Sequence, residues 1–252
     1  MYDRSLLGKP STCAWNVMSV FLKSAVPRDH AVPGASIAIQ TYGDFLNYNP
    51  HLHAIVTDGC FLPDGSFVGV PGFHAEDLEE AFQYEVLKML KKEGKINDAI
   101  IENMLSWRHT GFHVHIGARI WPEDENALGN LAKYIIRASF SQERMVYIHA
   151  EKSADGVAKV AYTSKDGKTE QTFDALDWLA RIVVHIPNKY EQLVRYLGVL
   201  QQVPRHAQKG RRRQNRAVDR ARRNDVQTVP PQVGDADSKK STKSIRSAVP
   251  IA

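Results

Sequence analysis

Two histidines separated by one apolar residue could hold a metal ion between them. His51 and His53 lie in the run from Asn49 to Gly59, whose β-branched and apolar residues predict a strand. Because successive side chains of a strand point to opposite faces, both imidazoles would project from the same face. The spacing alone is a weak signal, since a second such pair occurs at His113 and His115. A solvated or hydrogen-bonded pair of histidines is therefore the alternative interpretation.

A tyrosine on a predicted helix could supply a nucleophile. Helical periodicity follows Pro122-Glu123-Asp124, and we expect this helix to run to about Ser139. Its apolar residues share one face, whereas Tyr134 lies on the flank beside Asn130 and Arg137. A phenol with a pKa of about 10 attacks poorly at neutral pH, so it needs nearby cations, which Arg137 could provide. The alternative is an interfacial tyrosine beside a snorkelling arginine, without a catalytic role.

The remaining patterns predict an α+β fold with a largely antiparallel central sheet covered by helices. Helices and strands alternate through hairpin-type turns rather than long crossover connections, which favours this class. Residues 111–117 look extended and are a candidate neighbour of the His51 strand in one sheet. The other predicted elements are helices over 11–25, 75–92, 97–107 and 174–186, strands over 36–41, 145–150 and 157–163, and a short hairpin over 60–70.

The charge is distributed unevenly along the 252 residues, whose formal net charge is +5. From Pro204 to the end there are 13 Lys and Arg but 4 Asp and Glu, which leaves residues 1–203 with a net charge of −4. Arg211, Arg212 and Arg213 belong to a dense cationic stretch that could neutralise nucleic-acid phosphates, and a disordered solubilising tail is the alternative. Apolar periodicity fades after Gly198. We therefore predict a folded core over 1–200 and a disordered basic tail over 201–252.

Composition also bears on cell location and on cysteine chemistry. No apolar run approaches the roughly 20 residues that span a bilayer, and the first residues lack the pattern of a signal peptide. We therefore expect a cytoplasmic protein without a membrane partner. Cys13 and Cys60 are too few and too far apart for a zinc knuckle, which predicts two buried free thiols.

Six segments, taken in order, match the pattern of a known protein family. They cover residues 40–45, 49–59, 106–112, 131–144, 185–187 and 193–196. Together they resemble the rolling-circle HUH transposases of the insertion-sequence ninety-one type, and the similarity extends over roughly residues 1–198. Several linked motifs in one order are far more specific than any single motif.

The resemblance implies an HUH-endonuclease-like core and a metal-dependent DNA strand transferase in the bacterial cytoplasm. In that family a His pair binds Mg²⁺ or Mn²⁺, which assigns the metal to His51 and His53. A helix-borne tyrosine, matched by Tyr134 with Arg137 nearby, attacks DNA and leaves a 5′-phosphotyrosine link and a free 3′-OH. The expected partner is single-stranded DNA at the transposon ends, and no nucleotide cofactor is needed. Lys133 and the tail arginines would contact this DNA.

A third metal ligand should carry oxygen, because Mg²⁺ prefers oxygen to imidazole nitrogen. Gln40, on the preceding predicted strand, is the candidate. Its alternative is a strand residue bonded to solvent or backbone.

The chain departs from the family pattern in three places, one of which is the tail after Gly198. Ala138 stands where two-tyrosine members have their second tyrosine, which indicates the single-tyrosine branch. The cysteine-rich zinc-binding module with which relatives begin is missing, so we expect the chain to start inside the family's protein.

Two other functions compete with the nicking enzyme. One is a catalytically inactive DNA-binding remnant of such a transposase, which would bind DNA in a salt-sensitive way without metal-dependent cleavage. The other is a zinc hydrolase that uses His51, His53 and a water, although no third His or acidic ligand stands at a familiar spacing.

Overall fold

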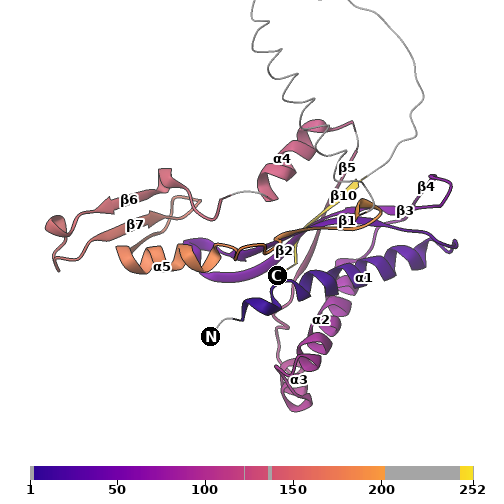
Figure 1. Ribbon diagram of the computed structural model, residues 1–252, viewed down its shortest axis with the longest axis horizontal. Coiled ribbons are helices and arrows are strands. Elements are labelled where there is room, and N and C mark those ends of the chain that lie inside the picture. The colour runs from indigo at the N-terminus through magenta and orange to yellow at the C-terminus, as the bar shows by residue number, and fades with distance from the viewer. Residues whose placement is uncertain (1–2, 122, 136–137, 202–244, 252) are drawn as a thin grey trace, which may run out of the picture.

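The computed structural model describes residues 3–121, 123–135, 138–201 and 245–251, and they form the α+β fold that the sequence predicts. A central five-stranded sheet has the order β5-β10-β2-β1-β9, and every neighbouring pair in it is antiparallel. Helices cover both of its faces (Figure 1). The strands of this sheet are β1 (Gly34–Tyr42), β2 (Tyr48–Thr57), β5 (Val114–Ile120), β9 (Val194–Gly198) and β10 (Ile245–Ile251).

One face of the central sheet packs against α1 (Lys9–Ala25) and α2 (Ala75–Lys92), and α3 (Asp98–Leu105) follows α2 (Figure 1). Ile37 of β1 and Ala54 of β2 lie opposite each other in the register, and both are buried in this core. Leu22 of α1 and Phe82 of α2 cover them. Each fully buried side chain of this size contributes about 1.5–3 kcal/mol to stability. This layer is the main hydrophobic core, and it confirms the predicted helices over 11–25 and 75–92.

The opposite face of the central sheet carries α4 (Glu125–Ile135), which lies across the sheet from α1 and α2 (Figure 1). Asp124 begins this helix, and its carboxylate accepts a hydrogen bond from the Ala127 backbone N–H at 2.8 Å. The predicted start of the helix is therefore confirmed. Its predicted end at Ser139 is wrong, because Ala138 already has no helical structure.

A smaller lobe is built around Trp178, which is buried beside Tyr162. Leu46, from the connection between β1 and β2, packs into the same cluster and joins the lobe to the central sheet. The lobe consists of α5 (Ala175–His185) and a three-stranded sheet of β6 (Met145–Ile148), β7 (Lys159–Thr163) and β8 (Glu170–Asp174). A separate hairpin of β3 (Gly59–Phe61) and β4 (Phe67–Gly69) confirms the hairpin predicted over residues 60–70.

The sequence does not lead one to expect β10, because its seven residues lie in the predicted disordered tail. The segment contains the β-branched residues Ile245, Val249 and Ile251, but the surrounding charged composition hides this local preference for a strand. Pro250 has no N–H to donate, and the pairing of β10 is irregular around it on both sides. As a result β5 shares a sheet with β2, as predicted, but β10 separates the two strands.

The structure also bears on the two cysteines and on the length and polarity of the helices. Cys13 and Cys60 are buried and free, as expected. Burial raises the pKa of both thiols above the ordinary value, so they stay protonated at neutral pH. Among the helices that the structure describes, none combines the length and the apolar character needed to cross a membrane.

Replacing Gly198 by alanine should destabilise the fold strongly. Gly198 has a φ of +61°, and a Cβ there would lie 2.0 Å from the Pro33 carbonyl oxygen. Gly65 is a matched control, because it has a φ of +83° but no heavy atom within 4 Å of the added Cβ. Both substitutions strain the backbone, and only Gly198→Ala adds a clash, which should cost about 2 kcal/mol more in urea unfolding. Equal losses in the two variants would contradict this packing of β9 against β1.

Candidate active site

The strand register places Gln40 beside the predicted metal-binding histidines. Gln40 pairs with His51, and Ala38 pairs with His53, between β1 and β2. Directly opposite residues of an antiparallel pair project from the same face, so Gln40, His51 and His53 share one face. Ile39 and Leu52 alternate with them and are buried against the helices α1 and α2. We call the side that carries Gln40 and the two histidines the His face.

His51 is held in one tautomer by the backbone of its own strand. Its Nδ1 lies 2.8 Å from the carbonyl oxygen of Asn49. A carbonyl only accepts, so Nδ1 carries the proton and Nε2 keeps its lone pair. The side chain is half-buried, and its ring centroid lies 4.9 Å from that of His53 with the ring planes at 82°. This is how a second group commonly orients a metal-binding histidine.

Gln40 joins His53 to the helix α4. The Gln40 Nε2 group donates to the Ile135 carbonyl oxygen at 2.7 Å, which fixes the orientation of the amide. Its Oε1 therefore faces His53 and accepts from His53 Nε2 at 3.2 Å. His53 is 3% exposed and Gln40 is 8% exposed, so this contact is well shielded from water. The alternative interpretation of Gln40 was a strand residue bonded to solvent or backbone. The bond from its Nε2 group to the Ile135 backbone agrees with that alternative, whereas its Oε1 atom contacts His53.

The same contact brings the backbone of Tyr134 to the His face. Tyr134 directly precedes Ile135, whose carbonyl Gln40 holds, at the C-terminal end of α4. Lys133, the predicted DNA contact, is exposed on the same turn. The described part of the structure does not include the side chain of Tyr134. It also does not include Arg137, Arg211, Arg212 and Arg213. The roles of these side chains stay predictions.

Among the described residues, the donors that lie together on the His face are two imidazoles and one side-chain amide. Among the described residues, no three His, Cys, Asp or Glu side chains gather to hold a metal ion. Among these residues, a third ligand beside His51 and His53 would have another chemistry, and the Gln40 Oε1 atom in contact with His53 could supply an oxygen. Ligands about 2.1 Å from one six-coordinate ion lie about 3 Å apart, close to the observed contact, and an ion bound there through Nε2 would replace the proton that His53 shares with Gln40. The described part of the chain therefore lacks the third nitrogen, sulfur or carboxylate ligand that a zinc hydrolase needs.

The second histidine pair lies elsewhere in the sheet. His113 Nδ1 is 3.5 Å from the Glu79 carboxylate of α2, and the same carboxylate accepts from the Val114 backbone N–H at 3.0 Å. The strand β10 separates this region from β2 and the His51 pair. His113 and His115 therefore do not share the site of His51 and His53.

A residue without an assigned role in the sequence fixes the strand next to the site. His185, at the end of α5, donates through Nε2 to the Leu46 carbonyl at 3.0 Å. Its Nδ1 then accepts from the Thr41 hydroxyl at 2.9 Å, directly beside Gln40. These two bonds hold the smaller lobe against the end of β1. Two features of the sequence point to His185, namely its position at a helix end before Pro187 and its place in the family-like segment 185–187.

Comparison with known proteins identifies the family. Residues 34–207 match the family model Y2_Tnp, described as "Putative transposase". The chain belongs to this transposase family. The match includes Gln40, both histidines of the site and Tyr134, and it supports the resemblance to transposases of the insertion-sequence ninety-one type.

Two curated relatives are transposases by name. The transposase for insertion sequence element IS801 of Pseudomonas savastanoi pv. phaseolicola is 26% identical over 182 residues, which cover 65% of this chain and 42% of the relative. Putative transposase y4qJ of Sinorhizobium fredii is 24% identical over 187 residues, which cover 66% of this chain and 46% of the relative. The chain spans less than half the length of both relatives. No solved structure matches significantly.

Replacing Gln40 by leucine should loosen α4. The change removes both amide contacts and leaves His53 Nε2 and the Ile135 carbonyl without this partner, a cost of about 1–3 kcal/mol. We expect backbone amides of residues 125–135 to exchange hydrogen at least about fivefold faster, measured by mass spectrometry. Gln83→Leu is the control, because Gln83 is also 8% exposed but lies on α2 across the sheet. Equal exchange of α4 in the two variants would show that Gln40 does not anchor the helix.

Proposed function

We propose that this chain is the nicking and joining core of a transposase that moves DNA by a rolling-circle route. Tyr134 is the nucleophile, and His51, His53 and Gln40 hold a Mg²⁺ or Mn²⁺ ion. One observation carries this proposal, namely that the Gln40 amide contacts both His53 and the last turn of the helix with Tyr134. Membership of a transposase family supports DNA as the proposed substrate.

In this proposal some residues of the site bind the ion or the DNA, and others orient the residues that bind. Asn49 holds His51 in the tautomer that presents Nε2, and Gln40 aligns His53. A bound divalent ion would polarise the scissile phosphate and stabilise the charge that develops on its oxygens. Arg137, three residues after Tyr134, favours the phenoxide or binds a neighbouring phosphate. Lys133 and the arginines 211–213 neutralise phosphates along the strand.

The proposed reaction conserves the energy of the phosphodiester bond. The Tyr134 oxygen forms a bond to phosphorus and loses its proton, while the bond from phosphorus to the 3′ oxygen breaks and that oxygen gains a proton. The products are a 5′-phosphotyrosine link and a free 3′-OH. A later 3′-OH can attack the link and rejoin strands without ATP. Single-stranded DNA at the transposon ends is the proposed substrate.

The finer assignments follow from the same resemblance. Ala138 in place of a second tyrosine assigns the chain to the single-tyrosine branch, and the bacterial cytoplasm is the proposed location. A second function is a DNA-binding remnant that no longer cuts, in which the cationic stretch with Arg211, Arg212 and Arg213 would hold phosphates. The remnant would bind DNA with strong salt dependence but form no covalent link.

A covalent protein–DNA adduct tests the proposal. We expect labelled single-stranded DNA that spans an element end and its flank to form an SDS-resistant adduct in Mn²⁺, and none in EDTA. Tyr134→Phe should reduce the adduct by at least about 10³-fold, because it removes the attacking oxygen. Tyr147→Phe is a control, because Tyr147 lies on β6 in the smaller lobe.

Two other outcomes would contradict the proposal. An adduct that persists in Tyr134→Phe would refute the nucleophile. No adduct with folded wild type on either element end, together with salt-sensitive binding, would establish the remnant instead.

A further inference from the structure

A groove of about 810 Å³ runs between α1 and α2, the helices that cover the face of the sheet opposite α4 (Figure 1). We call it the α1–α2 groove. Its lining extends along α2 from Asp77 to Lys88, which corresponds to three turns of helix or about 16 Å. A groove of this length between two helices is suited to a third helix laid along it.

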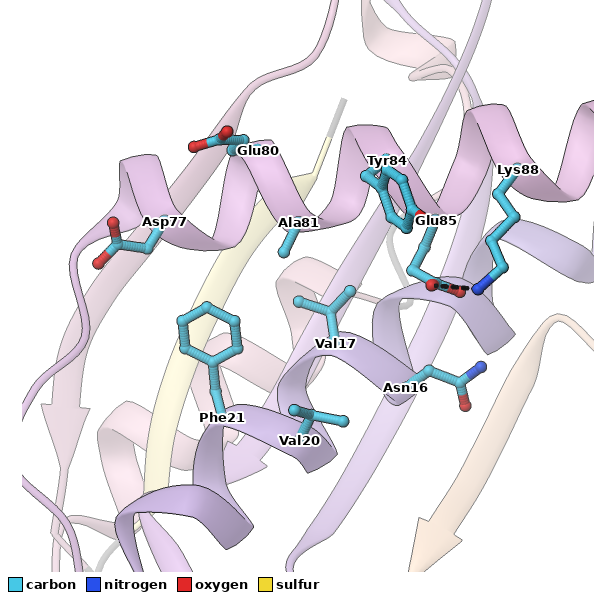
Figure 2. A pocket seen from close by; sticks show the side chains of 10 residues that line it. All are labelled: Asn16, Val17, Val20, Phe21, Asp77, Glu80, Ala81, Tyr84, Glu85 and Lys88. Atoms are coloured by element: carbon cyan, nitrogen blue, oxygen red, sulfur yellow. Dashed lines mark hydrogen bonds and ion pairs between the residues drawn. The ribbon is translucent and has the colours of Figure 1, made fainter.

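The floor of the α1–α2 groove is apolar. Figure 2 shows Val17, Val20 and Phe21 of α1 facing Ala81 and Tyr84 of α2. Val17 is buried, but Val20 is 65% exposed and Tyr84 is 64% exposed. Single exposed apolar residues are common on protein surfaces, whereas these two line one hollow together with a buried side chain. A helix laid in the groove would cover both of them.

Carboxylates of α2 also line the groove. Asp77, Glu80 and Glu85 contribute to it, and among the described lining residues the one cation is Lys88. Lys88 pairs with Glu85 at 3.2 Å, whereas neither Asp77 nor Glu80 forms an ion pair with another described residue. Figure 2 shows these two carboxylates at the end of the groove near Phe21. This end repels the phosphates of DNA and attracts a cationic segment of protein.

The stability of α2 itself explains these carboxylates only in part. Asp77 lies in the first turn, where a negative charge interacts favourably with the helix dipole. Glu80 lies beyond that turn, and its neighbours one turn back are Glu76 and Asp77. Like charges at this spacing destabilise a helix. A cation from a bound partner would relieve the repulsion.

We propose that the α1–α2 groove binds a basic amphipathic helix of a protein partner. The apolar face of that helix lies on Val20 and Tyr84, and one of its lysines or arginines lies over Asp77 and Glu80. Exposed ion pairs add little affinity alone, so the apolar floor provides most of the binding and the carboxylates select a cationic partner. Because the groove and the His face lie on opposite sides of the sheet, binding of this partner does not depend on the nicking function proposed above.

Two designed peptides test this surface. Each is an amphipathic helix of about 16 residues with the same leucines on one face, flanked either by lysines or by glutamates. The full chain should bind the lysine peptide with a Kd of about 10 µM or tighter, measured by fluorescence anisotropy. It should bind the glutamate peptide at least about tenfold more weakly.

A polar substitution in the floor tests the apolar contact. Val20→Asn should weaken binding of the lysine peptide at least about fivefold, because it buries an amide under the apolar face of the peptide. Val146→Asn is the matched control, since Val146 is 60% exposed on β6 in the smaller lobe. It should leave the binding unchanged. If Val20→Asn alters the fold by circular dichroism, Tyr84→Ala replaces it.

A charge reversal tests the selection of a cationic partner. Glu80→Lys should reduce the preference for the lysine peptide from about tenfold to less than about threefold. Glu102→Lys makes the same change at an exposed position on α3, away from the groove, and should keep the preference.

Several results would overturn the proposal. They are no binding of the lysine peptide, equal effects of Val20→Asn and Val146→Asn, and a preference that Glu80→Lys leaves unchanged. A synthetic peptide of residues 205–223 that binds as tightly would assign the groove to the basic stretch of this chain instead. A dimer in sedimentation velocity that Val20→Asn abolishes would assign it to a second copy.

Discussion

The arrangement of the site depends on one side-chain amide. Gln40 donates to the Ile135 carbonyl and accepts from His53, so its two ends cannot be exchanged without losing both bonds. It lies on β1, yet it links a histidine of β2 to a helix more than 70 residues later in the chain. Because the amide is shielded from water, breaking either bond leaves a buried polar group unsatisfied. The position of the tyrosine helix relative to the histidines is therefore coupled to a single residue.

The apolar core fixes the face on which Gln40 and the histidines lie. Ile37, Ile39, Leu52 and Ala54 point toward α1 and α2, and the polar residues alternate with them. A slip of one residue would carry the histidines into the core and the apolar residues out of it. The end of β1 receives further support from His185, which bonds Thr41 and the Leu46 carbonyl. Hydrophobic burial thus sets the strand register, and hydrogen bonds fix the end of β1 against the smaller lobe.

Local patterns in the sequence predict much of this arrangement. Helical periodicity locates α1 and α2, and strand alternation places His51 and His53 on one face, as the register confirms. Distant pairing leaves no such pattern, so β9 and β10 were not expected. Gln40 was a candidate because it precedes the His strand, but its bond to the Ile135 backbone is a contact that no side-chain pattern encodes. The role of His185 as an anchor was missed for the same reason.

The central claim is that Gln40, His51 and His53 form one ion site below the helix of Tyr134. An anomalous difference map from crystals of the protein soaked in Mn²⁺ tests it most directly. The account predicts a peak about 2.1–2.3 Å from a nitrogen of each histidine and from Gln40 Oε1, with the Gln40 bond to the Ile135 carbonyl retained. A peak at His113 and Glu79 instead, or a peak at the histidines with Gln40 turned away, would contradict it.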